Sequence, residues 1–241
     1  MKLHEKKTSK QLCLSLADWI CDYIGKVLQK RDRFTLCLSG GNSPRQLYEL
    51  LAQSPFKEKI PWEKLHIFFG DERYVPFDDE RNNGRMANET LLRHVAVPRK
   101  QIHFIHTTLP PETSAMVYEE TLNQYFGGQK NSFDLVLLGM GTDGHTLSLF
   151  PHSEIIHEKK YWVKSFLHEE DDMFRITLTP PLINRAKRIA FLVTGKKKSP
   201  ALKKVLKGKS DPEKFPAKII KPGSGELHWF VDEGAASGQS K

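Results

Sequence analysis

The chain has few cysteines and no long apolar segment. Among its 241 residues the cysteines are Cys13, Cys21 and Cys37, and their spacing matches neither a metal site nor a redox motif. We therefore expect three reduced thiols, as in most cytoplasmic proteins. No apolar run is long enough to span a bilayer, and Asp18 and Asp22 interrupt the apolar stretch near the N-terminus. The sequence thus predicts a cytoplasmic protein with neither a membrane span nor a secretory signal.

Motifs that would indicate a metal or nucleotide site are also missing. The ten histidines show no spacing that would gather three ligands on one element. The chain contains no Walker sequence, no dinucleotide-binding fingerprint and no Gly-x-Ser-x-Gly elbow. No cysteine stands beside a histidine in a way that indicates an activated nucleophile. We therefore expect no metal site and find no signature of a serine or cysteine nucleophile.

The balance of charges favours an acidic partner. Lysine and arginine together number 37 against 29 acidic residues, which leaves a net charge of +8. Both nucleic acid and phosphorylated metabolites would be attracted by this charge. The basic residues are spread along the chain, however, and neither zinc-finger spacing nor an aromatic RNA-binding signature is present. We therefore expect a small phosphorylated molecule as the partner, and no nucleic acid or membrane.

The alternation of apolar strands with amphipathic helices is typical of an α/β protein. The expected strands cover residues 34–38, 65–69, 102–105, 133–138, 175–178, 189–194 and 229–231. The expected helices cover residues 8–30, 44–51, 86–92 and 112–126 and begin again near Ser199. This order predicts a three-layer, mostly parallel, Rossmann-like sheet with helices on both faces. We expect one domain over residues 1–241, with a core from about residue 10 to residue 236 and a flexible tail at 237–241.

The segment from Phe133 to Thr146 gives the strongest indication of a site. A buried strand rich in leucine and valine passes into a glycine-bearing turn, which presents Asp143 and His145 at the start of a predicted helix. The pKa of histidine is the nearest to neutral pH, so His145 could accept a proton from a reacting molecule. Asp143 could orient His145, bind a sugar hydroxyl or cap the following helix. Alternatively, His145 only makes local hydrogen bonds in a tight connection.

Four polar or glycine-bearing turns follow predicted strands. They are Ser39–Ser43, Asp71–Arg73, Gly139–His145 and Gly195–Lys198. Because the carboxyl ends of parallel strands meet at one edge of a sheet, we expect these turns to form a single site. Successive residues of an extended chain point in opposite directions, so residues 71–73 cannot all face that site. One or two of them would serve the site and the rest would brace the loop.

The first of these turns could bind a phosphate. Its residues are Ser39, Gly40, Gly41, Asn42 and Ser43. Free backbone N–H groups and a helix N-terminus suit an anion, with Ser43 as the predicted N-cap and Pro44 as the first helical residue. A simple glycine turn is the alternative. Lys198 and Arg175 could neutralise the phosphate, although a solvated lysine and a strand-edge ion pair are the more common roles for such residues.

These residues resemble a known family. In their order along the chain, the motifs are similar to those of the 6-phosphogluconolactonases of the pentose phosphate pathway. The matching segments are Ser39–Pro44, Gly70–Pro76, Asn82–Met86, Gly139–Thr146, Ser148–Pro151, Arg175–Thr179, Val193–Lys198, Trp229 and Asp232. Each segment is modestly specific, whereas the ordered set is highly specific and extends from about residue 10 to residue 236.

The resemblance implies hydrolysis of 6-phospho-D-glucono-1,5-lactone to 6-phospho-D-gluconate without a metal or organic cofactor. It also implies a fold shared with sugar-phosphate deaminases and isomerases. We expect a monomer or weak dimer. By the same resemblance His145 would be the general base, with Asp143 beside it. The Ser39–Ser43 turn, Arg175 and Lys198 would hold the 6-phosphate. The substrate would also meet Asp71, Arg73 and Asn83.

The chain departs from the family pattern at three places. Ser43 stands where the family usually has threonine, and Asn82 where it usually has serine. The approach to Arg175 is the acidic segment His168–Phe174, where many members have a segment rich in lysine and proline. Two alternatives to the lactonase stay open, namely a deaminase or isomerase on the same scaffold and a sugar-phosphate-binding protein without turnover.

Overall fold

The computed structural model describes residues 1–209 and 211–238. Its centre is a six-stranded sheet in which each pair of neighbouring strands runs parallel. In spatial order the strands are β1 (Lys2–Lys6), β9 (Glu226–Asp232), β8 (Arg188–Val193), β5 (Leu135–Leu138), β2 (Phe34–Leu38) and β3 (Leu65–Phe69). The predicted α/β class with a parallel sheet is therefore confirmed.

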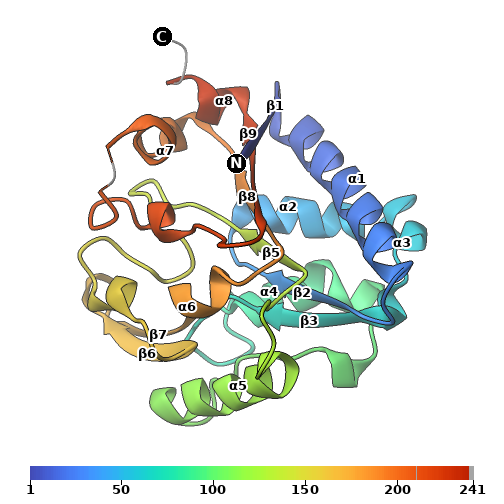
Figure 1. Cartoon of the computed structure of the whole chain (residues 1–241), viewed down its shortest axis with the longest axis horizontal. Coiled ribbons are helices and arrows are strands. Elements are labelled where there is room, and N and C mark those ends of the chain that lie inside the picture. Colours follow the sequence, from blue (N-terminus) through green and yellow to red (C-terminus); the bar gives the residue numbers. More distant parts are fainter. Residues whose placement is uncertain (210, 239–241) are drawn as a thin grey trace.

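Helices cover the sheet on both sides. The α-helices are α1 (Ser9–Leu28), α2 (Asn42–Leu51), α3 (Phe56–Lys59), α4 (Asn83–Thr90), α5 (Pro111–Phe126), α6 (Pro180–Ile183), α7 (Ser199–Lys207) and α8 (Glu233–Ala236). In Figure 1, α1, α2 and α3 lie on one side of the sheet, and α6 and α7 lie on the other. Every residue of β2 and of β5 is buried, which explains why these strands are continuous apolar runs.

The first helix shows how local sequence defines an element. Thr8 precedes α1 and its side chain accepts a hydrogen bond from the N–H of Gln11, as an N-cap does. Leu12, Leu16 and Ile20 recur at helical spacing, and all three are fully buried against the sheet. In the described ranges no helix combines the length and the apolar character needed to cross a bilayer.

A second, smaller sheet lies beside the main one. It contains β4 (Asp71–Arg73), β7 (Met173–Leu178) and β6 (Val163–His168), all antiparallel. The strand predicted at residues 175–178 is therefore confirmed, but it belongs to this smaller sheet and not to the main one. The strand expected at residues 102–105 is wrong, because only a single bridge joins Ile102 to Ile67. The segment before it has η2 (Leu92–His94) and η3 (Arg99–Gln101), which are single 3-10 turns.

Both ends of the described chain are more ordered than expected. Strand β1 pairs with β9, so the core begins well before residue 10. Its polar sequence at the sheet edge has no apolar alternation, which is why the pattern did not indicate a strand. After β9, the chain forms α8, and the N–H of Gly238 donates to the hydroxyl of Ser199 over 2.7 Å. Of the predicted flexible tail, residues 239–241 lie outside the described residues.

Candidate active site

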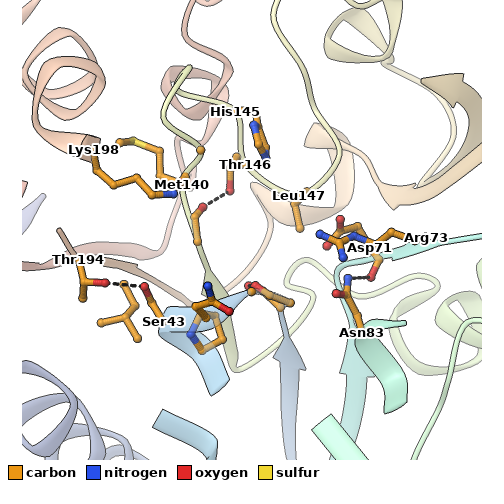
Figure 2. A pocket seen from close by; sticks show the side chains of 18 residues that line it. Ser43, Asp71, Arg73, Asn83, Met140, His145, Thr146, Leu147, Thr194 and Lys198 are labelled. Atoms are coloured by element: carbon orange, nitrogen blue, oxygen red, sulfur yellow. Dashed lines mark hydrogen bonds between the residues drawn. The ribbon is translucent and has the colours of Figure 1, made fainter. Parts of the chain in front are cut away.

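The four predicted turns meet at one cavity, at the carboxyl edge of the main sheet. They follow β2, β3, β5 and β8, which all run in the same direction. The cavity is lined by Ser39, Gly40, Gly41, Asn42, Ser43, Pro44, Asp71, Arg73, Asn83, Gly139, Met140, Gly141, His145, Thr146, Leu147, Leu192, Thr194 and Lys198. In Figure 2, Thr194 and Lys198 lie toward one side of the view and Arg73 toward the other, with His145 above and between them.

The turn after β2 is arranged differently from the prediction. Gly41, with φ 107°, precedes the first residue of α2, so the helix begins at Asn42 and no side chain caps it. Ser43 is therefore not the N-cap, because the helix begins two residues earlier than predicted, directly after the positive φ of Gly41. Its hydroxyl instead lies 2.6 Å from that of Thr194 at the end of β8. No side chain therefore caps the first N–H groups of α2, and the first residues of this helix line the cavity.

Gly40 makes room for Asn83. A Cβ on residue 40 would lie 1.8 Å from Oδ1 of Asn83, which is far inside contact distance. The Nδ2 of Asn83 donates to the backbone carbonyl of Asp71 over 2.9 Å (Figure 2). Asn82 caps α4 by accepting a hydrogen bond from the N–H of Arg85. The start of α4 is thus packed against the first turn, and Asn83 becomes part of the cavity wall.

The residues of β4 alternate as the extended chain requires. Asp71 and Arg73 line the cavity, whereas Glu72 points to the opposite side and is 2% exposed. The carboxylate of Asp71 accepts a hydrogen bond of 2.8 Å from the hydroxyl of Ser148. Glu72 accepts hydrogen bonds from the N–H groups of Arg73, Asn83 and Gly84 at 2.7–2.8 Å. The buried carboxylate therefore fixes α4 to the strand that carries Arg73.

Burial raises the pKa of Glu72 to about 7, although its three backbone hydrogen bonds favour the charged form. Because this value lies above the ordinary 4.5, the folded chain holds the proton more tightly than the unfolded chain does. Its contribution to the free energy of unfolding is complete below pH 4.5 and is lost as pH rises through about 7.

Replacement of Glu72 by glutamine is expected to lower the free energy of unfolding by about 1–3 kcal/mol, because an amide N–H₂ would face a backbone donor. It should also remove the pH dependence that Glu72 contributes. Urea unfolding at about pH 5 and about pH 8 would measure both effects. Glu63→Gln is the matched control, because Glu63 is exposed. A Glu72→Gln protein as stable as the control would contradict this role.

His145 and Asp143 form a hydrogen-bonded pair at the cavity. Nδ1 of His145 lies 2.7 Å from Oδ1 of Asp143, which also accepts the backbone N–H of His145 over 3.1 Å. Burial alone would raise the pKa of Asp143, but the hydrogen bonds and the charge of His145 outweigh it and hold the pKa below its usual value. Asp143 itself does not line the cavity. With Nδ1 engaged, Nε2 is the nitrogen available to a bound molecule.

The chain around this pair does not enter a helix, contrary to the prediction. The positive φ of Gly144 (87°) and Leu147 (55°) turns the backbone, and a bridge joins Thr146 to Leu149. The next helical element is the short η4 (Glu154–His157). Asp143 therefore orients His145 instead of capping a helix.

Gly141 allows the pair to pack against the backbone. A Cβ on residue 141 would lie 2.2 Å from both Oδ1 of Asp143 and Nδ1 of His145. The ring of Phe150 supports the other side of the imidazole, with ring centroids 4.6 Å apart. The imidazole is thus held by a carboxylate, a glycine and an aromatic ring.

Lys198 brings a positive charge into the cavity. It ends the turn η6 (Lys196–Lys198), and its Nζ donates to the carbonyl of Met140. Burial lowers the pKa of Lys198, and the nearby carboxylate of Asp143 opposes this shift. The side chain is therefore directed into the site, in contrast to the exposed Lys196 and Lys197.

Arg175 is the one predicted cation that does not line the cavity. Its guanidinium is 8% exposed and pairs with Asp171, a residue of the acidic turn η5 (Glu169–Asp171). In the small sheet it stands opposite Arg73, which does line the cavity. Arg175 therefore does not reach the cavity directly, since a carboxylate from its own hairpin pairs with it, and its role in holding the phosphate stays a prediction.

Sequence reasoning missed several groups that complete the site. Thr194 follows a buried strand, as Ser39 does, and this position could have revealed it. Ser148 and Phe150 lie beyond the recognised turn and act through Asp71 and His145. Both fall within the family-matching segment Ser148–Pro151, but no local pattern gives their roles, because their contacts depend on the fold of residues 142–150. Within the described ranges, no group of three or more potential ligands is placed to hold a metal ion.

Comparison with known proteins agrees with this architecture. The sequence profile of the family described as glucosamine-6-phosphate isomerases/6-phosphogluconolactonase matches residues 7–229. A 6-phosphogluconolactonase of Synechocystis sp. is 42% identical over 216 residues, which are 88% of this chain and 87% of the relative.

Solved structures extend the likeness to the whole fold. The 6-phosphogluconolactonase of Thermotoga maritima superposes with a TM-score of 0.83 at 30% identity, covering 96% of this chain and 99% of its own. A monomeric glucosamine-6-phosphate deaminase superposes with a TM-score of 0.84 at 22% identity, covering 99% of this chain and 100% of its own, and shows the fold alone. The chain therefore belongs to the glucosamine-6-phosphate isomerase/6-phosphogluconolactonase family.

Proposed function

We propose that this protein hydrolyses 6-phospho-D-glucono-1,5-lactone to 6-phospho-D-gluconate. The observation that carries the proposal is the position of His145. Its Nδ1 is held by Asp143, and its Nε2 is left for a cavity that also contains an uncapped helix N-terminus and Lys198. The side chain of His145 is 31% exposed, so water has access to it. The similarity to proteins named 6-phosphogluconolactonase supports this choice of reaction.

The reaction requires only these groups and one water molecule. Nε2 of His145 takes a proton from water as the water oxygen attacks C1 of the lactone. Backbone N–H groups or a nearby cation stabilise the negative charge on the carbonyl oxygen. When the bond from C1 to the ring oxygen breaks, the histidinium returns the proton to that oxygen. The products are a carboxylic acid and a free hydroxyl, so the atoms of one water molecule are accounted for.

We assign the phosphate to the end of the cavity formed by the Ser39–Ser43 turn. The free N–H groups of α2 can donate to phosphate oxygens, and Lys198 supplies a point charge. Asp71, Arg73 and Asn83 would then lie along the sugar. A cytoplasmic location and a monomeric or weakly dimeric state are part of the same proposal, and the free thiols of all three cysteines support the former.

A coupled assay with freshly prepared lactone, corrected for spontaneous hydrolysis, tests the proposal. The expected result is turnover of the phosphorylated lactone and no release of ammonia from glucosamine 6-phosphate. Ammonia release would favour the deaminase. The sequence after β3 does not support that alternative, because this chain has Gly70–Arg73 where deaminases usually have Leu-Asp-Glu-Tyr. Binding without either reaction would favour a sugar-phosphate sensor.

Lys198→Ala is expected to raise KM for the phosphorylated lactone by about 10- to 100-fold, because a charge-assisted hydrogen bond to phosphate is lost. The reaction of the dephosphorylated lactone should change far less. Steady-state kinetics with both substrates would measure the difference. Lys197→Ala is the matched control, since Lys197 lies in the same turn but is exposed. If KM rose equally for the phosphorylated and the dephosphorylated lactone, Lys198 would not bind the phosphate.

A further inference from the structure

The acidic turn η5 contacts a buried arginine next to the site. Asp171 pairs with Arg175, and its carboxylate also lies 3.4 Å from Nδ1 of His168. Asp172 follows in the left-handed region with φ 47°, at the tip of the hairpin that joins β6 to β7. The turn therefore folds back onto its own hairpin and places one carboxylate on Arg175.

Arg175 is only partly satisfied by this contact. Its side chain is 92% buried, and its Nε has no hydrogen-bond partner among the described residues. Arg73, its neighbour across the small sheet, also has a buried Nε without a partner in the same part of the chain. Because Arg73 and Arg175 stand directly opposite each other in the antiparallel pair, their side chains leave the same face of the small sheet, and two guanidinium groups on one face suit an anion with several oxygens.

The ion pair is asymmetric. Asp171 is 43% exposed, whereas Arg175 is 8% exposed. Burial alone would raise the pKa of Asp171, but Arg175 outweighs it and keeps the carboxylate charged. The exposed carboxylate can be solvated when it leaves, whereas the buried guanidinium needs another anion in its place. An arriving anion could therefore take over the contact that Asp171 makes.

Arg175 lies one aromatic ring away from the reacting group. Its guanidinium carbon is 5.8 Å from the centroid of the Phe150 ring, which in turn packs against His145. Arg73 lines the cavity directly. An anion that bridged the two arginines would thus lie at the edge of the proposed active site.

We infer that Asp171 is an internal competitor for Arg175, which a phosphate-like anion must displace when it binds at Arg175 and Arg73, apart from the Ser39–Ser43 turn to which the phosphate of the substrate is assigned. The inference concerns the binding of an anion and does not depend on the proposed function. Asp171 would then set the affinity of the site, and its removal would strengthen binding. The acidic segment would weaken binding through this single contact and not through its overall charge.

Calorimetric titration of the full chain with inorganic phosphate tests the inference. Asp171→Asn is expected to bind phosphate about 3- to 10-fold more tightly, because a competing ion pair is removed. Glu170→Gln is the matched control, since it removes the same charge from the adjacent residue, and its affinity should stay within about twofold of the parent. Adding Arg175→Ala to Asp171→Asn should abolish the gain.

Unchanged or weaker phosphate binding by a folded Asp171→Asn protein would overturn the inference. It would show that the ion pair between Asp171 and Arg175 only stabilises the hairpin. An equal gain in phosphate affinity in Glu170→Gln would overturn it too, because the gain would then come from the loss of any negative charge nearby and not from the contact with Arg175. If Asp171→Asn does not fold, Asp171→Ala is titrated instead, and failure of both to fold would show a structural requirement that also overturns it. Lactone hydrolysis is assayed separately. If the phosphate affinities change as expected but the protein does not hydrolyse the lactone, only the proposed function would be wrong.

Discussion

Replacement of His145 by glutamine is expected to lower kcat by about 10²–10⁴-fold, because the general base is lost while the cavity keeps its shape. KM should change little, since the proposed phosphate contacts lie on other turns. Initial rates over a range of lactone concentrations would separate the two constants.

His106→Gln is a suitable control for this experiment. His106 is exposed, lies outside the cavity and has no side-chain contact among those described. Its variant should retain the kinetics of the parent. If His145→Gln also retained near-normal turnover, another group would have to activate the water, and the proposed mechanism would be wrong.

Gly141→Ala is expected to lower kcat by about 100-fold, because the catalytic pair would have to move by an ångström or more. The new Cβ would lie 2.2 Å from each of the two atoms that join Asp143 to His145. The pair must therefore separate or shift. Steady-state kinetics would show the loss, and thermal unfolding would show whether the chain still folds.

The same turn provides a matched control for this change. A Cβ on Gly139 would meet its nearest neighbour, the hydroxyl of Ser39, only at 3.9 Å. Gly139→Ala should therefore be nearly neutral, although it lies two residues away and also lines the cavity. Similar losses in both variants would show that the backbone of the turn, and not the space beside the pair, limits activity.

The main sheet was predictable because its strands are apolar on both faces. Phe34–Leu38 and Leu135–Leu138 can be covered only by helices on both sides, and such runs are easily recognised. Strands β1 and β6 were missed for the opposite reason, since β1 is largely exposed, β6 is only partly buried, and neither is a continuous apolar run. Because the strands of the main sheet run parallel, four turns meet at one edge, and the location of the candidate site follows from the strands alone.

The internal geometry of the site was less predictable. The alternation of Asp71, Glu72 and Arg73 follows from extended backbone, and the structure shows it. The helix start at Asn42 depends instead on the positive φ of Gly41. The pairing of Arg175 with Asp171 depends on the fold of a hairpin tip. These contacts arise from tertiary structure, which local patterns do not encode.

The position of β1 affects how this chain can fold during synthesis. Among the strands of the described residues β1 pairs only with β9, and its register pairs Lys2 with His228 and Lys6 with Asp232. While the ribosome is still adding the intervening residues, β1 therefore has no strand to join. The loop that this pairing closes includes almost the entire chain, so the entropic cost of closing it is high unless the rest of the sheet has formed. We expect β1 to dock as one of the last steps of folding, after the catalytic edge has been assembled.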